Sequence, residues 1–166
     1  MSLINKITVL LFCLLIVSEA SAQEIKKVGK FKDWETVVVT DGSKKLCFAQ
    51  SKPVLQSPKK DPREARLFIS FRPADKIKDE VSVTSGHEYK SASVTATSGK
   101  NEFSMFSQGN FAWLIDREEE ASLIKTMKKA SRLSILAKAN NGRQTKDLYS
   151  MMGFTKAYNT AKKNCA

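Results

Sequence analysis

Short runs of alternating apolar and polar residues dominate this 166-residue chain. In the clearest run, Leu67, Ile69 and Phe71 fall on one side of an extended segment and Ser70 falls on the other. A period of two residues is typical of a half-buried β-strand. Similar runs bounded by turn residues predict strands at 31–40, 46–50, 66–72, 80–84, 89–97, 102–107, 111–115, 133–139 and 143–150. Because the strands do not alternate with helices, the predicted fold class is all-β, an antiparallel β-sandwich.

Two segments change to the helical period. Residues 117–129 follow Asp116, a suitable N-cap, and Glu119 stands three residues after it, as in a capping box. Near the C-terminus, one helix face carries Phe154, Ala157, Tyr158, Ala161 and Cys165. The sequence therefore predicts two short helices, one of them C-terminal. Residues 51–64 contain three prolines and are predicted to form a long exposed loop.

Residues 1–22 have the form of a cleavable signal peptide. A lysine precedes the apolar run 7–17, and Ala20 and Ala22 follow in the small-residue pattern that signal peptidase accepts. This predicts cleavage after Ala22 and one mature domain at 23–166. The apolar run is shorter than the ~20 residues of a membrane-spanning helix, so we expect no transmembrane anchor after cleavage. The expected location is the periplasm, the cell envelope or the cell surface.

Two cysteines, Cys47 and Cys165, remain after the predicted cleavage, whereas Cys13 lies inside the predicted signal. An even number of cysteines in an exported domain indicates a disulfide, and two cysteines allow one pairing. Closing a loop of this length contributes ~4–5 kcal/mol on the chain-entropy model. Two free thiols are the alternative. No metal is expected, because two cysteines and one histidine do not make a zinc site.

The chain is strongly basic, with 28 Lys and Arg against 17 Asp and Glu, a net charge of +11. Loss of Lys6 and Glu19 with the signal leaves 27 against 16, which is again +11. Such a field favours anionic partners, which in the envelope are lipid headgroups, lipopolysaccharide, acidic glycans or acidic proteins, and no nucleic acid is expected. The candidate face for an anionic partner comprises Lys26, Lys27, Lys30, Lys32, Lys44 and Lys45. A basic surface that only keeps the protein in solution is the alternative.

No catalytic constellation is visible in the sequence. The sole histidine, His87, lies beside Glu88 in a turn-like segment, where a histidine is usually solvated. No G-x-S-x-G nucleophile elbow and no phosphate-binding glycine loop is present. The acidic run Glu118–Glu120 is explained by the dipole of the predicted helix. The protein is therefore predicted to be non-enzymatic, with no catalytic residues and no cofactor.

Five aromatic residues allow two interpretations. They form either a stacking platform for a ligand or the core of the sandwich, and the second is favoured. These residues are Trp34, Phe103, Phe106, Phe111 and Trp113.

Five segments together carry a family resemblance: residues 31–34 (FKDW), 47–50 (CFAQ), 67–74 (LFISFRPA), 110–114 (NFAWL) and 147–158 (DLYSMMGFTKAY), with a closing Cys165. They resemble the invasion-associated locus B proteins of alphaproteobacteria over nearly the whole mature chain. Met151 and Met152 depart from the leucine and lysine expected in that family. The resemblance implies an exported, immunoglobulin-like β-sandwich without established catalytic residues, linked in pathogenic members to entry into host cells.

Two functional hypotheses follow. The first is a non-enzymatic exported envelope protein of the locus B type that engages an anionic envelope or host-surface partner. The second is a periplasmic peptide- or glycan-binding module, or a chaperone-like one. A contiguous exposed aromatic or apolar groove would separate the second hypothesis from the first.

Overall fold

The computed structural model describes residues 23–166, so the predicted signal peptide at 1–22 lies outside the described residues. Eleven strands form one hydrogen-bonded, antiparallel sheet in the order β1-β2-β3-β5-β6-β9-β8-β7-β10-β11-β4. Within residues 23–166, no helix is long and apolar enough to cross a membrane. The strands are β1 (Glu24–Phe31), β2 (Trp34–Asp41), β3 (Lys44–Ser51), β4 (Leu55–Ser57), β5 (Arg66–Arg72), β6 (Ile77–Thr84), β7 (Val94–Ser98), β8 (Asn101–Gln108), β9 (Phe111–Trp113), β10 (Arg132–Lys138) and β11 (Gln144–Ser150).

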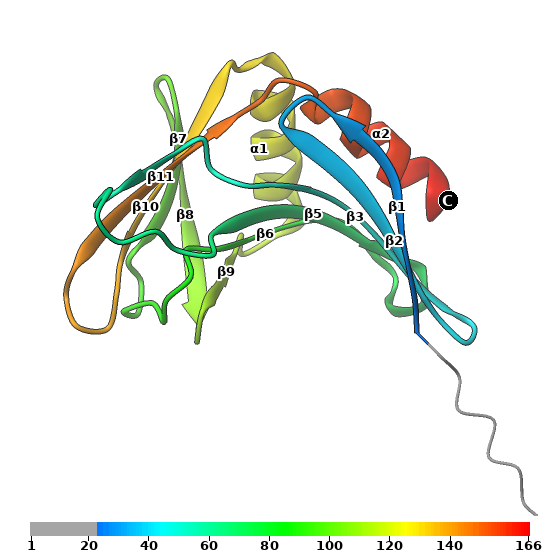
Figure 1. The fold of residues 1–166 in the computed structure, drawn as a ribbon, viewed down its shortest axis with the longest axis horizontal. Coiled ribbons are helices and arrows are strands. Elements are labelled where there is room, and N and C mark those ends of the chain that lie inside the picture. The colour runs from blue at the N-terminus through cyan, green and yellow to red at the C-terminus, as the bar shows by residue number, and fades with distance from the viewer. Residues whose placement is uncertain (1–22) are drawn as a thin grey trace, which may run out of the picture.

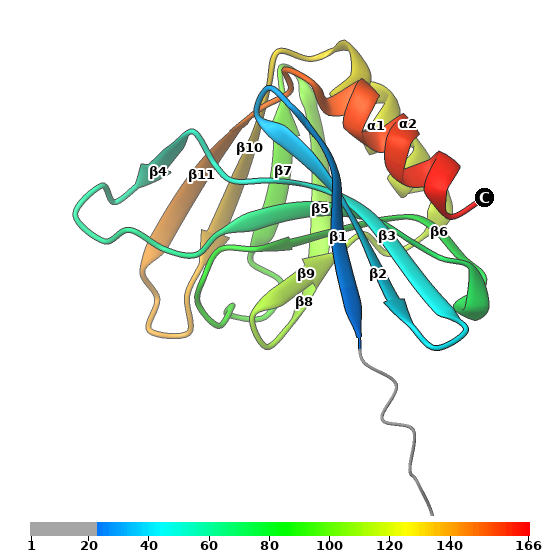
Figure 2. The ribbon, with the colours of Figure 1, turned by 45° about the vertical axis from the view of Figure 1, so that its right-hand side comes forward.

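The sheet bends sharply at β8 (Figures 1 and 2). Residues 101–105 of this strand pair with β7, whereas residues 106–108 pair with β9. Strand β8 thus passes from one half of the sheet to the other, and the two halves run in different directions. The antiparallel all-β fold with two helices is confirmed. Two separate sheets in an immunoglobulin-like sandwich are not shown, because these hydrogen bonds join all the strands into one sheet.

Two helices cover one face of the sheet, which we call the helix face; the other is the open face. Helix α1 (Arg117–Lys129) packs against β6 and β8, and α2 (Phe154–Asn164) packs across β1, β2, β3 and β5. Both lie on the same side of the sheet (Figure 2). Alternate residues of β5, Leu67 and Ile69, are fully buried on the helix face. One continuous core therefore joins both halves of the bent sheet to the two helices.

The helix boundaries confirm the sequence pattern. The Asp116 side chain accepts hydrogen bonds from the backbone N–H of Glu118 and of Glu119, both at 2.9 Å, so it caps α1 as predicted. Further along α1, the Glu120 carboxylate accepts a 3.2 Å hydrogen bond from the backbone N–H of Val81 in β6. Strand β9 pairs with only Ser82 and Val83 of β6. The backbone N–H of Val81 lies beyond this paired region, and the Glu120 carboxylate takes the place of a strand partner.

Helix α2 is fixed to the first strands by several long-range contacts. The Trp34 ring lies 4.8 Å from the Phe154 ring, and its Nε1 donates a 2.8 Å hydrogen bond to the Ser150 carbonyl. Just before α2, Gly153 has φ of 90°, and a Cβ there would stand 1.8 Å from the Phe31 carbonyl oxygen. Only glycine permits this approach, so the start of α2 is locked against the end of β1.

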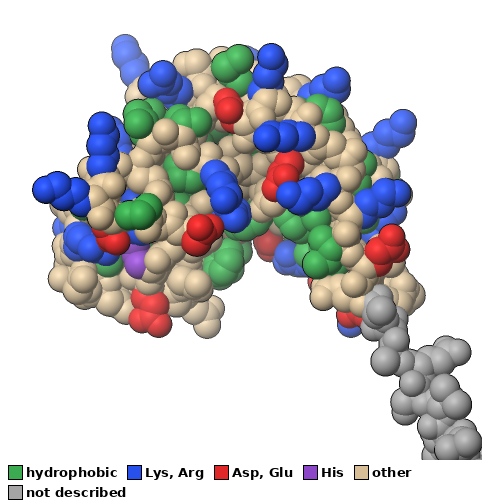
Figure 3. Space-filling model, viewed as in Figure 1, with side chains coloured by type: hydrophobic (Ala, Val, Ile, Leu, Met, Phe, Trp, Pro, Cys, Tyr) green, Lys and Arg blue, Asp and Glu red, His purple; other side chains and the backbone are tan. Residues whose placement is uncertain are grey.

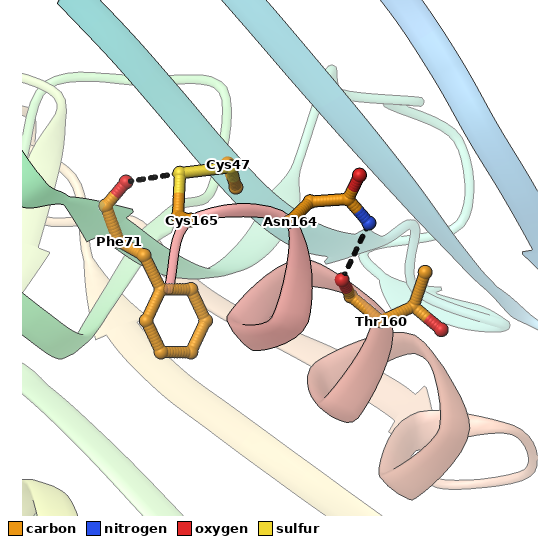
Figure 4. The surroundings of a disulfide bond; sticks show 5 residues. All are labelled: Cys47, Phe71, Thr160, Asn164 and Cys165. Atoms are coloured by element: carbon orange, nitrogen blue, oxygen red, sulfur yellow. Dashed lines mark hydrogen bonds between the residues drawn. A yellow bond between two sulfur atoms is a disulfide. The ribbon is translucent and has the colours of Figure 1, made fainter.

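The predicted disulfide joins Cys47 of β3 to Cys165 at the end of α2 (Figure 4). The two Cα atoms are 5.8 Å apart, within the normal range for a disulfide. Cys47 is fully buried, and the sulfur atom of Cys165 contacts the Phe71 carbonyl oxygen. The disulfide therefore lies at the edge of the core. The apolar face of the predicted C-terminal helix is confirmed, since Phe154, Ala157, Tyr158 and Ala161 are all buried.

The segment 51–64 is more structured than the predicted exposed loop. It contains β4, which pairs with β11 at the far edge of the sheet. It also carries Arg63, whose side chain is 3% exposed and forms a 2.7 Å ion pair with the fully buried Asp147. The prolines suggested solvent exposure, but this buried pair holds the segment against the body of the protein.

Candidate functional site

The six lysines of the predicted basic face do not lie together. Lys27 and Lys30 pair with Val37 and Glu35 of β2, whereas Lys26 pairs with Val38, whose side chain belongs to the core. Lys32 precedes β2. Lys44 and Lys45 are the first two residues of β3 and pair with Asp41 and Thr40 at the opposite end of β2. The structure therefore groups Lys27, Lys30 and Lys32, and it separates Lys26, Lys44 and Lys45 from them.

A β-bulge explains why Lys27 and Lys30 share a side of the strand. Residues three apart in a regular strand point to opposite faces. Here the register with β2 shifts between Lys27 and Gly29, and the extra residue turns both lysines toward the open face. Sequence alternation alone does not reveal this shift.

These lysines line a pocket of about 420 Å³ at the end of β1, β2 and β3. We call it the basic pocket. Its cations outnumber its carboxylates by five to two. The cations are Lys27, Lys30, Lys32, Lys52 and Arg66, and the carboxylates are Asp33 and Glu35.

Two charged side chains of the basic pocket, Glu35 and Arg66, already have partners within the protein. Glu35 accepts a 2.6 Å hydrogen bond from Gln50 and forms a 3.3 Å ion pair with Lys27. Arg66 donates through Nη2 to Glu64 at 3.3 Å, but its Nη1 is buried and has no hydrogen-bond partner among residues 23–166. The Arg66 side chain is still 26% exposed, so the accessible part of its guanidinium group can meet an anion in the pocket.

A row of aromatic side chains crosses the open face. Its consecutive ring centroids are 5.8, 6.3, 5.9 and 5.6 Å apart. We call it the aromatic ladder: Phe48 of β3, Phe68 of β5, Phe111 and Trp113 of β9, and Phe106 of β8. None of these residues is buried, and the Phe106 side chain is 47% exposed.

The surface is hollowed on the side of β5 and β6 away from the helices, with hydrophobic side chains on the walls of the hollow (Figures 1 and 3). On this side, polar and aromatic residues alternate from strand to strand. Gln50 pairs with Phe68, Phe68 with Ser82, Ser82 with Trp113, and Trp113 with Phe106. Ser82 is buried, so of these residues the open face offers the ring surfaces and the half-buried amide of Gln50.

This arrangement corrects the interpretation of the aromatics. Trp34 and Phe103 belong to the core, as favoured from the sequence. Phe106, Phe111 and Trp113 instead belong to the aromatic ladder, so the core interpretation is wrong for them. Alternation along the strands was the sequence signal that could have placed these rings outside the core. Phe106 follows Met105 and Trp113 follows Ala112, and because Met105 and Ala112 are buried in the core, the residues after them face the other side of the sheet.

The aromatic ladder ends at a shallow groove of about 340 Å³. Its lining includes Phe106, Trp113, Ile115, Glu80 and Glu120. Burial raises the pKa of Glu120 to about 6, and the neighbouring Glu80 carboxylate adds to the rise, while the hydrogen bond from Val81 opposes it. Glu80 itself is held by Arg72 in a bidentate pair at 2.9 and 2.8 Å.

The only histidine of the chain lies outside this face. The Nε2 atom of His87 is 3.0 Å from the Thr145 hydroxyl and its Nδ1 is 3.0 Å from the Glu88 carbonyl oxygen. These contacts account for both ring nitrogens with groups that do not form a catalytic triad. Among residues 23–166, no three His, Cys, Asp or Glu side chains gather closely enough to hold a metal ion.

Comparison with known proteins gives no relative for this chain. No protein-family model, no curated protein and no solved structure matches it. The functional inference therefore depends on the geometry of the open face and its basic pocket.

Proposed function

We propose that this chain is an exported, non-enzymatic protein of the cell envelope that binds an anionic partner at the basic pocket. One observation carries the proposal: five cations, among them a partly exposed arginine, and only two carboxylates line a single pocket. The arginine provides directed hydrogen bonds to a carboxylate or phosphate, and the lysines provide attraction.

Two further features support the proposal: the first concerns export and the second concerns the anionic partner. The Cys47–Cys165 disulfide is of a kind that persists in oxidising compartments outside the cytoplasm. The net charge of +11 attracts anionic surfaces over a Debye length of ~8 Å at physiological salt. Membership of the invasion-associated locus B family is part of this proposal and depends on the sequence resemblance alone.

A second candidate function is a binding module for a glycan or a peptide. The aromatic ladder favours it, because exposed aromatic side chains gathered on one face typically mark a binding surface. The two candidates are compatible, since both place the partner on the open face.

The test uses linear polyphosphate, a polyanion without rings, and compares two double variants that remove the same charge. Lys27→Gln/Lys30→Gln alters the basic pocket, whereas Lys44→Gln/Lys45→Gln, the turn variant, alters the start of β3, next to the distant β2–β3 turn. Calorimetric titration of the protein with polyphosphate at low and high salt measures the affinities. We expect binding that weakens with salt and is reduced much more by the pocket variant than by the turn variant. Equal losses in the two variants, or affinity that does not depend on salt, would overturn the proposal.

A further inference from the structure

The aromatic ladder is not required by the core. The core of this protein lies on the helix face, where the apolar side chains of β5 and β6 pack beneath α1 and α2. The five rings of the ladder project from the opposite face, where polar residues normally alternate outward. A fold does not need five neighbouring aromatics there, so they require another explanation.

The aromatic ladder lies beside the basic pocket. Phe68 lies two residues after Arg66 on β5, so both side chains leave the same face of the strand. Gln50 lines the pocket and is also the direct cross-strand neighbour of Phe68. Positive charge and aromatic surface are therefore consecutive parts of one site that runs across β3, β5, β6, β9 and β8.

The geometry of the sheet restricts what lies along this site. A peptide binds a sheet best at an edge, where free backbone groups accept it as a further strand. In the interior of the open face the backbone groups of β3, β5 and β6 are already paired with neighbouring strands. A peptide placed there would have its own amides desolvated against rings without partners.

A sugar chain suits the same surface. Its rings present C–H groups that pack on aromatic side chains, and its hydroxyls bond to amide groups such as that of the half-buried Gln50. Gln50 is the direct cross-strand neighbour of Phe68, so amide and ring are adjacent. Carboxylates on the chain supply the negative charge that the basic pocket requires.

Nucleic acid combines negative charge with rings as well, but it fits the aromatic ladder less well. The Trp113 ring lies 5.6 Å from the Phe106 ring and 5.9 Å from the Phe111 ring, each with an interplanar angle of 27°. At these spacings the rings partly cover one another, so the broad flat surface that a base needs for stacking is reduced.

From these observations we propose that the anionic partner is an acidic polysaccharide. A carboxylate of one sugar is held in the basic pocket, and the following sugars lie over the aromatic ladder. This inference rests on the proposed function and adds the chemical class of the partner to it.

The experiment titrates the intact protein with polygalacturonate, with its methyl-esterified form, with polyphosphate and with polyuridylate. Phe106→Ser removes an exposed ring of the ladder. Leu55→Ser is the matched control, because Leu55 is similarly exposed, at 51%, on the distant edge strand β4. We expect Phe106→Ser to raise the Kd for polygalacturonate by roughly tenfold, as for the loss of one aromatic contact, with no change in the control. The Kd for polyphosphate is expected to stay unchanged in both variants.

Tryptophan fluorescence gives a second readout at the site itself. Trp34 is 1% exposed in the core, so quenching by acrylamide in the folded protein reports mainly on Trp113. Bound polygalacturonate is expected to protect Trp113 from quenching, whereas bound polyphosphate is not.

The outcomes separate this inference from the proposed function. Polygalacturonate affinity that is insensitive to Phe106→Ser, or equal to that of the esterified form, overturns the polysaccharide assignment while pocket-dependent polyphosphate binding still supports the proposed function. Polyuridylate binding that is tighter than polygalacturonate binding and is weakened by Phe106→Ser replaces polysaccharide with nucleic acid. Absence of binding to every polyanion overturns both.

Discussion

The buried ion pair between Arg63 and Asp147 is expected to be a large local determinant of stability. Two hydrogen bonds join the side chains, Nη1 to Oδ2 at 3.0 Å and Nη2 to Oδ1 at 2.7 Å. Arg63 Nη1 also donates to the Ser85 carbonyl at 2.7 Å, and Gln56 donates to Asp147 Oδ1 at 3.2 Å. The pair thus connects the 51–64 segment to β11 and to the end of β6.

The magnitude follows from the burial of both side chains, 3% exposed for Arg63 and 0% for Asp147. Removal of one partner from a buried pair leaves an uncompensated charge and typically costs about 3–5 kcal/mol. Single domains are stable by only about 5–15 kcal/mol, so either single variant is expected to lose a large share of the free energy of unfolding. Replacement of both residues by apolar ones leaves no buried charge, and it is expected to cost much less than the sum of the two single losses.

The measurement is a double-mutant cycle with Arg63→Met, Asp147→Leu and the double variant. Urea unfolding followed by tryptophan fluorescence, with the disulfide intact in every variant, gives the free energies. We expect each single variant to lose about 3 kcal/mol or more and the double variant to recover a substantial part of the summed loss. Single losses below about 1 kcal/mol, or additivity within about 0.5 kcal/mol, would show that the pair is not the coupled buried unit described above.

Two further predictions concern the disulfide and the groove at the end of the aromatic ladder. Cys47→Ala/Cys165→Ala opens a loop with a sequence separation of 118 residues and is expected to lose up to about 5 kcal/mol in urea unfolding; a loss below about 1 kcal/mol would contradict the chain-entropy account. The pKa of Glu120 is raised from 4.5 to about 6, so the folded state binds its proton more tightly and stability falls as pH rises through this window. Glu120→Gln is expected to remove this pH-dependent loss of stability and to raise the free energy of unfolding at pH 7 by on the order of 1 kcal/mol, after allowance for solvent screening. The check is the urea midpoint measured from pH 4 to 7, and the same pH dependence in the variant and the unmodified protein would refute this.

The sequence predicted those elements whose own residues carry the signal. Helix α1 begins and ends where the capping pattern at Asp116 and the lysines at 128 and 129 placed it. Strand β5 shows period-two burial, and the pairing of Cys47 with Cys165 followed from their number and from the apolar face of α2. In each case a local pattern or a small count was sufficient.

The missed elements depend on pairing between distant segments. Strand β1 was missed because its first five residues, Glu24 to Val28, include three charged side chains that stay exposed, and its shape comes from pairing with β2. Strand β4 has three residues and exists through β11. The single bent sheet arises because β8 pairs with both β7 and β9. Apolar and polar residues alternate along the strands in the same way in a two-sheet sandwich, so this pattern did not distinguish the two folds.

The candidate site shows the same division. Lysine composition predicted an anionic partner face, but the bulge at Lys27–Gly29 and the position of Lys44 at the far end of β3 decided which lysines share a pocket. Arg66 joins that pocket through tertiary structure, and it was not part of the predicted face. Phe68 between buried Leu67 and Ile69 was a local sign of the ladder, but its ring neighbours come from β3 and β9.

The attachment of α2 to the first strands has a consequence for the order in which this protein is completed. A chain made from its N-terminus produces β1 to β3 early and α2 last, about 120 residues later. Until then the Trp34 ring and the Thr36 hydroxyl, which are covered by Phe154 and Ala157, have no partner from the helix. Nascent chains stopped a few residues before Phe154 therefore keep an apolar strip on β2 and β3 uncovered, and such chains are the ones on which we expect a holdase chaperone to act.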